Sequence, residues 1–412
     1  MSTPEEPALQ RRLGIADAVT IGLGAMIGAG IFVALPPAAA AAGSGLLVAL
    51  AVAALVAYCN ATSSARLAAQ YPQSGGTYVY GRERLGEFWG YTAGWSFVVG
   101  KTASCAAMAL TVGVYAWPAH AHAVAVAAVV ALTAVNYAGI QKSAMLTRVT
   151  VAVVLAVLAA VVVAVVGDGV DGNRPRSGLE QGTASGVLQA AGLLFFAFAG
   201  YARIATLGEE VRNPRRTIPL AIPIALGITL VVYAAVAVAL EVQLGGDLAT
   251  SSAPLADAVR AAGHPGLEPV VRVGAAVAAL GSLLSLILGV SRTTLAMARD
   301  RHLPHTLAAV HPRFGGPHRA EVAVGVVVAV VAAVADVRAA IGFSAFAVLL
   351  YYAIANAAAM TLGRKMIPIV GLAGCALLAV LLPVTSVLAG ACVVALGVLA
   401  YAARRTKSRW PR

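Results

Sequence analysis

Charged residues are scarce in this sequence. Only 11% of its 412 residues are Asp, Glu, Lys or Arg, whereas 60% are hydrophobic, and the mean hydropathy is +0.85. A soluble protein of this length needs many more polar side chains to cover its surface. The composition therefore excludes a soluble protein and predicts an integral membrane protein.

Cysteine and histidine are also sparse, and their positions favour neither a metal site nor a catalytic one. All four cysteines fall inside apolar stretches, at Cys59, Cys105, Cys375 and Cys392. The seven histidines fall at the ends of apolar stretches or between them, and none has a metal-ligand spacing such as H-E-x-x-H. We therefore expect no disulfide framework, no metal, no cofactor and no enzymatic activity.

Acidic residues are fewer than basic ones, 17 against 29, which leaves a formal net charge of +12. Nucleic-acid binding would explain such a charge, but no basic segment is interleaved with aromatic residues that could stack on bases. If the N-terminus lies inside, the opposite set of loops carries only a few cations: Arg174, Arg176, Arg260, Arg272 and Arg338. This bias predicts a protein of the cell membrane with both termini, residues 1–14 and 404–412, in the cytoplasm.

Long polar linkers are missing too, so residues 1–412 are predicted to form one all-α integral membrane domain. Apolar runs of about 20 residues, the length that crosses lipid hydrocarbon, predict about twelve spans. They lie near 15–38, 44–66, 88–116, 119–140, 149–167, 187–208, 217–242, 270–297, 320–336, 338–361, 366–383 and 385–403. The turn-rich stretch 244–269 has room for a short interfacial helix around residues 254–262.

Glycine, by contrast, is abundant, and it gathers where a membrane helix tolerates it least. The segment GLGAMIGAGIF at 22–32 holds four glycines in span one, and Phe198-Ala199-Gly200-Tyr201 interrupts span six. Unwound backbone is tolerated at mid-depth only where it lines a cavity or meets a ligand, because lipid cannot pair free N–H and C=O groups. Two interruptions five spans apart predict an inverted-repeat transporter, with 15–167 and 187–361 as its repeats and 366–403 as two extra helices.

The two interruptions present opposite backbone groups. Where the second half of span one begins, near Gly30, free N–H groups favour a carboxylate. Where the first half of span six ends, near Phe198 to Gly200, free carbonyls favour an ammonium, and the pair would suit an α-amino acid. Close helix packing is the alternative reading of such glycines. Gly24 fits that alternative, whereas Gly28-Ala29-Gly30 is expected to form the opening.

Three segments in this order resemble the amino acid–polyamine–organocation (APC) permease superfamily. They are GLGAMIGAGIF at 22–32, FFAFAGYARIATLGEEVRNPRRTIP at 195–219, and GVSRTTLAMARDRHLP at 289–304. The resemblance covers at least the first ten predicted spans. It implies a LeuT-like fold of five-plus-five inverted repeats, with broken helices one and six, and about twelve transmembrane helices in all. It also implies a secondary active carrier of amino acids or related amines that works by alternating access as a symporter or antiporter.

The resemblance further implies which positions hold the substrate. The backbone at Ile27, Gly28, Ala29, Gly30 and Ile31 is expected to hold the substrate carboxylate. The backbone at Phe198, Ala199, Gly200 and Tyr201 is expected to hold its amino group. Similar carriers use an aromatic side chain here to cover the substrate, and Phe196 and Tyr201 are the candidates, although packing alone would also explain them.

One lysine, Lys101, lies inside span three. A charge at mid-span costs about 2.5–3.5 kcal/mol on insertion scales, so this side chain should face the protein interior. The surrounding run from Gly94 to Thr102 nearly spells a nucleotide-binding loop, but five residues instead of four separate its glycines, and bulky side chains fill it. Three roles remain open for Lys101: a proton-titrating group, a contact to a substrate carboxylate, or a cation held by backbone carbonyls.

Coupling and gating remain open as well. Some superfamily members carry a lysine in span five where this chain aligns Val154, so Lys101 is the candidate substitute if protons are the coupling ion. Arg203 is either a cation that reaches the cytoplasmic interface or one that selects the substrate. Glu209 and Glu210 are candidate gating residues. A sodium site would need serine oxygens such as those of Ser282 and Ser285, which more often bond their own helix. A sensor or a channel on the same fold is the alternative function.

Overall fold

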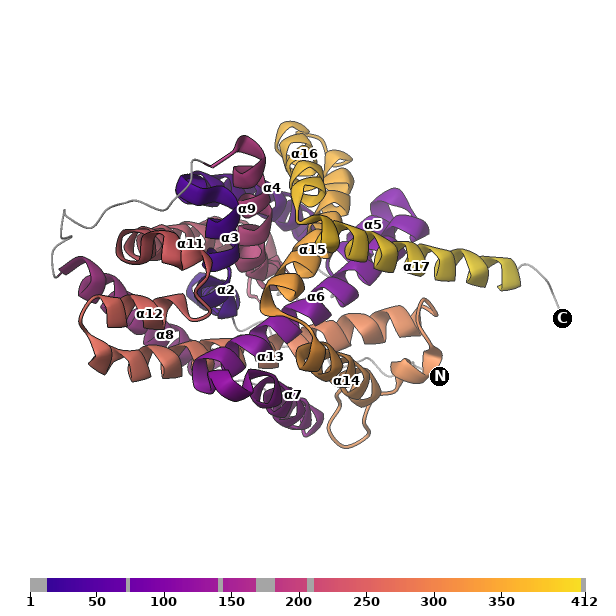
Figure 1. The fold of residues 1–412 in the computed structure, drawn as a ribbon. Helices are drawn as coiled ribbons and strands as arrows, with labels where there is room; N and C mark the ends of the chain where they lie inside the picture. The colour runs from indigo at the N-terminus through magenta and orange to yellow at the C-terminus, as the bar shows by residue number, and fades with distance from the viewer. Residues whose placement is uncertain (1–12, 72–74, 140–143, 168–181, 206–210, 409–412) are drawn as a thin grey trace.

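The computed structural model describes residues 13–71, 75–139, 144–167, 182–205 and 211–408. These residues form a bundle of helices, shown in Figure 1, with one isolated β-bridge between Leu13 and Val211. The α-helices are α1 Ile15–Met26, α2 Ala29–Val33, α3 Leu35–Ala42, α4 Leu46–Gln70, α5 Thr77–Leu85, α6 Glu87–Ala116, α7 Ala121–Tyr137, α8 Ala144–Gly167, α9 Ala184–Phe198, α10 Ala202–Ala205, α11 Pro214–Leu244, α12 Pro254–Ala261, α13 Glu268–Arg299, α14 His318–Val334, α15 Val337–Met360, α16 Met366–Leu381 and α17 Val384–Ser408. Short 3-10 helices are η1 Gly43–Gly45, η2 Pro118–His120, η3 Ala199–Tyr201, η4 Gly245–Ala249, η5 Pro265–Leu267 and η6 His305–Ala308.

Ten helical segments among the described residues are long and apolar enough to cross a membrane. Two of the twelve predicted spans are shorter: α14 has 17 residues and α16 has 16. Extended backbone at Ala335 ends α14 early, and Pro383 follows α16 closely. The prediction of a multi-pass membrane protein is therefore confirmed, with ten helical segments as candidate spans. The short helix expected near residues 254–262 is also present, as α12.

Helix α6 crosses the middle of the bundle, packed against α13 and α15 (Figure 1). Small residues allow this close approach. A Cβ placed on Gly100 would lie 2.8 Å from the Cβ of Ala347 and 3.2 Å from a methyl group of Val348. Because lipid gives no hydrophobic drive for helix association, such close packing supplies much of the attraction. Lys101, the next residue along α6, is thereby carried into the centre of the protein.

Both predicted interruptions are present. Helix α1 ends at Met26 and α2 begins at Ala29, and the backbone at Ile27 leaves the helical region with φ −81° and ψ 51°. Helix α9 ends at Phe198, where the 3-10 turn η3 leads into α10. The predicted first span, 15–38, was expected to have one break and is divided into three helices, α1, α2 and α3, the last of which continues to Ala42 before η1 leads into α4.

Candidate functional site

The two interruptions lie directly against each other. A Cβ placed on Gly200 would meet the carbonyl of Ala25 and would lie 2.7 Å from the backbone nitrogen of Met26. A Cβ on Gly30 would lie 2.7 Å from Cα and 2.8 Å from Cβ of Ala197. Only glycine permits backbone to approach backbone this closely. The contact between the span-one and span-six interruptions therefore depends on a glycine in each of them, Gly30 and Gly200.

Hydroxyl groups from neighbouring helices pair with carbonyls at the interruptions. The Tyr233 hydroxyl of α11 lies 2.5 Å from the carbonyl oxygen of Met26 and 3.2 Å from that of Ala197, so it can donate to either. The Ser282 hydroxyl of α13 donates to the carbonyl of Gly24 over 3.1 Å. Carbonyls at the end of α1 lack helical partners, and lipid cannot supply any. Side chains of α11 and α13 therefore supply the hydrogen-bond donors that these backbone carbonyls lack within their own helices.

The carbonyl of Ala199 in η3 accepts from two side chains. The ammonium nitrogen of Lys101 lies 3.3 Å from this oxygen, and the Tyr352 hydroxyl of α15 lies 3.4 Å from it. Lys101 is only 6% exposed. Of its three predicted roles, the contact seen in the structure is the one to a backbone carbonyl. Titration and substrate contact stay predictions.

The residues predicted to hold the carboxylate are all buried, from Ile27 through Ile31. Gly28, the residue before α2, faces α13: a Cβ there would meet the Ser282 hydroxyl and would lie 2.9 Å from the Ser282 Cβ. Ser282 therefore both caps the end of α1 and packs on the start of α2. Ser285, the other serine considered for a cation, donates to Gly281 of its own helix instead.

Aromatic rings surround the span-six interruption. The Phe198 ring packs on Tyr233 with centroids 5.2 Å apart, and the Tyr201 ring packs on Tyr352 at 5.1 Å. Phe196 is 8% exposed and lies in the same core. These contacts show packing for Phe198 and Tyr201, and the covering role of Phe196 and Tyr201 stays a prediction.

Two residues important to this geometry were not predicted from the sequence, Tyr233 and Tyr352. Both lie within apolar helices, where a buried phenol must find a hydrogen-bond partner. That rule could have drawn attention to them, but not to their particular partners. Arg203 lies in α10, half-buried, just after the interruption. Glu209 and Glu210 lie outside the described residues.

The structure bears on two further interpretations of the sequence, the near match to a nucleotide-binding loop and the apolar residue Val154. The near match to a nucleotide-binding loop, Gly94 to Thr102, lies wholly within continuous α6, so it forms no phosphate loop. Val154 is a buried residue of α8. Span five therefore has an apolar side chain where the sequence comparison aligned the lysine of some superfamily members.

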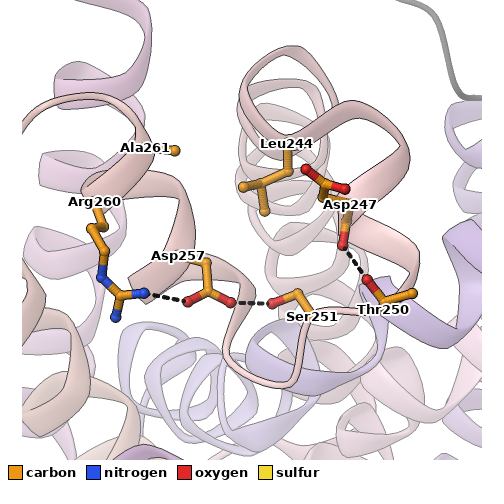
Figure 2. A pocket seen from close by; sticks show the side chains of 7 residues that line it. All are labelled: Leu244, Asp247, Thr250, Ser251, Asp257, Arg260 and Ala261. Atoms are coloured by element: carbon orange, nitrogen blue, oxygen red, sulfur yellow. Dashed lines mark hydrogen bonds and ion pairs between the residues drawn. The ribbon is translucent and has the colours of Figure 1, made fainter.

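Pockets at the ends of the bundle are separate from the interruptions. Figure 2 shows one of about 530 Å³, in which Asp257 accepts a hydrogen bond from Ser251 over 2.6 Å and pairs with Arg260. It is lined by Leu244, Asp247, Thr250, Ser251, Asp257, Arg260 and Ala261. A second, of about 480 Å³, is lined by Ala69, Gln70, Arg212, Asn213, Pro214, Arg215 and Arg216.

A polar junction joins α5 to the end of α13. The Tyr78 hydroxyl donates to Asp300 over 2.5 Å and lies 2.8 Å from Nδ1 of His302, while Arg82 donates to Asp300 over 2.7 Å. Burial raises the pKa of Tyr78. Burial also lowers the pKa of His302, although the negative charge of Asp300 acts to raise it. At His302, burial favours the neutral imidazole and the Asp300 carboxylate favours the protonated one, and the effect of burial is the larger.

Comparison with known proteins adds a family and several relatives. The sequence profile of a family described as amino acid permease matches residues 13–411. An uncharacterized transporter of Mycobacterium tuberculosis (strain ATCC 25618 / H37Rv) is 71% identical over 417 aligned positions, which cover 99% of this chain and 94% of the relative. The cationic amino acid transporter 6, chloroplastic, of Arabidopsis thaliana is 28% identical over 88% of this chain and 67% of its own length. The branched-chain amino acid permease BcaP of Bacillus subtilis (strain 168) is 27% identical over 77% of this chain and 73% of its own length.

Proposed function

Because this chain belongs to the amino acid permease family, we propose that it is a secondary active carrier that moves an amino acid or a related amine across the cell membrane by alternating access. Transport of the substrate is coupled to the movement of protons or to exchange for a second substrate. The proposal includes twelve spans in a five-plus-five inverted repeat, with both termini in the cytoplasm. The names of the relatives point to cationic substrates in one case and branched-chain substrates in another, so they leave the substrate class open.

The observation that carries this proposal is the contact between the two helix interruptions. Interrupted helices are costly in a membrane unless their free backbone groups meet a partner or a ligand. Here they abut through Gly30 and Gly200, with carbonyls held by Tyr233 and Lys101. These partners are side chains, which can exchange for a ligand without unfolding a helix.

In this proposal the backbone at 27–31 binds the substrate carboxylate and the backbone at 198–201 binds its ammonium. Phe196 and Tyr201 cover the ligand. Because Gly30 and Gly200 place backbone directly against backbone, the two interruptions must move apart for a substrate to bind between them. Lys101, Arg203, Glu209 and Glu210 are the residues we propose for coupling and gating of that movement.

Counterflow in proteoliposomes tests the proposal. The purified chain is reconstituted into vesicles loaded with an unlabelled amino acid, and entry of the same labelled amino acid is followed with and without a pH gradient. A thermal-shift screen against amino acids and polyamines selects the compounds. A carrier gives saturable uptake that is stimulated by substrate on the other side.

Two results would contradict this function. Conductance without trans-stimulation would indicate a channel, and binding without flux would indicate a sensor. Stabilisation only by compounds that are neither amines nor amino acids would refute the assignment of the two backbone segments to carboxylate and ammonium.

A further inference from the structure

The ammonium of Lys101 lies on a carbonyl that the proposed function assigns to the substrate. Its nitrogen is 3.3 Å from the oxygen of Ala199, within the 3-10 turn that interrupts span six. The Tyr352 hydroxyl, 3.4 Å from the same oxygen, is a second donor to it. The protein therefore already holds a cation where a substrate ammonium is expected to bind.

No carboxylate among the described residues neutralises this lysine. The ion pairs in that part of the chain lie elsewhere, at helix ends and loops such as Arg82–Asp300 and Arg260–Glu268. The ionisable side chain next to Lys101 on α6 is Cys105, one turn away. The hydroxyls of Thr102 and Ser104 are engaged with carbonyls of α6 itself. Lys101 is thus 6% exposed, at the centre of a membrane protein, and held by a carbonyl dipole instead of a countercharge.

An uncompensated buried cation is costly, and the cost falls when a negative charge arrives. A neutral amino acid adds an ammonium and a carboxylate, so it leaves the positive charge of Lys101 uncompensated, and only a substrate with an additional negative charge compensates it. Counting Lys101 with the ligand, a basic amino acid leaves two positive charges in the site, and a neutral amino acid leaves one. An acidic amino acid, with two carboxylates and one ammonium, leaves the site neutral.

We propose that this carrier selects acidic amino acids, of the aspartate and glutamate class, and that Lys101 is the residue that selects them. The inference rests on the proposed function. The α-ammonium of the substrate replaces Lys101 at the Ala199 carbonyl, and the freed Lys101 ammonium pairs with the side-chain carboxylate. Basic amino acids are rejected because their cationic side chain finds no anion in the site.

The lysine side chain is flexible enough to move from the Ala199 carbonyl to the side-chain carboxylate of a bound substrate. Its four-carbon stem lets the ammonium leave Ala199 without moving α6, which is fixed by the contacts of Gly100 with Ala347 and Val348. Tyr352 stays as a donor at the carbonyl during the exchange. The selecting charge is therefore mobile, whereas the helix that carries it is not.

The test is counterflow of the full-length protein in proteoliposomes with three labelled probes: L-glutamate, L-leucine and L-arginine. We expect L-glutamate to be carried, with L-arginine weaker by about tenfold or more, the scale of effect of one buried charge pair. Lys101→Met, which keeps the length and removes the charge, should lower L-glutamate uptake about tenfold or more and raise L-leucine relative to it. Lys101→Arg should keep the acidic preference, and Lys365→Met, at an exposed lysine, should change nothing.

Several results would overturn the inference. Preference of the wild-type protein for L-arginine or L-leucine over L-glutamate would refute it and leave the carrier function standing. An unchanged preference in Lys101→Met would remove Lys101 as the selecting residue. If Lys101→Met does not fold, as judged by size-exclusion and melting, the wild-type order and Lys101→Arg decide the matter. Absence of counterflow for all three probes in a protein that carries another compound selected by the thermal-shift screen would overturn the inference and leave the proposed function standing.

Discussion

Gly200 is the position at which one added methyl group tests the contact between the two interruptions. In Gly200→Ala the new Cβ would meet the carbonyl of Ala25 and would lie 2.7 Å from the nitrogen of Met26. These are backbone atoms, so they cannot rotate away as a side chain would. The helix segments must separate instead. Overpacking of this kind costs about 1–3 kcal/mol.

The same substitution has the opposite effect in an ordinary helix. Replacing an exposed helical glycine with alanine stabilises a helix by about 0.5–1 kcal/mol, because alanine loses less backbone entropy on folding. Gly227 in α11 is such a position: it is exposed, and a Cβ there would meet nothing within 4 Å. Gly227→Ala is therefore a matched control whose expected change in stability has the other sign.

Thermal unfolding in detergent measures the difference, and counterflow measures its effect on function. For a chain of this length we expect Gly200→Ala to lower the melting temperature by about 1–4 °C. Gly227→Ala should leave it unchanged or slightly higher. Substrate-dependent stabilisation and uptake should fall in Gly200→Ala alone. Equal melting temperatures and equal uptake in the two variants would show that the interruptions do not press together as the structure has them.

Three further predictions concern single polar side chains. Tyr233→Phe leaves the carbonyl of Met26 without this donor and should destabilise the protein by about 1–3 kcal/mol in chemical or thermal unfolding; no change would mean that another group replaces the hydroxyl. Glu321 is 1% exposed and neither carboxylate oxygen has a hydrogen-bond partner among the described residues, so Glu321→Gln should raise the melting temperature, and a fall would reveal a partner for the charge. Burial lowers the pKa of His302 below its ordinary 6.5, so the unfolded chain binds this proton more readily; stability present above pH 6.5 should be lost as the pH falls, and His302→Asn should weaken that loss in melting curves from pH 5 to 8.

The sequence determined the class of protein and the places where its helices fail. Charge content and apolar run length decide membrane insertion residue by residue, without reference to a partner. The interruptions at Gly28 and at Phe198 to Tyr201 could be located because a break in a helix depends on the residues at the break itself, above all on glycine. Span boundaries were less well predicted. Helix α14 has the expected length but begins and ends two residues early, at the extended backbone of Ala335, and α16 ends two residues early, just before Pro383.

Only the tertiary structure decided what meets the interruptions. Lys101 is 98 residues from Ala199, and Tyr233 is 207 residues from Met26. No local pattern encodes such pairs, because they depend on how α6 and α11 pack against the broken helices. The sequence predicted that a carbonyl near Ala199 would attract an ammonium, and the chain brings one of its own from α6 to that oxygen. The approach of α6 to the interruption depends on how the helices pack, and packing is a property of the whole bundle.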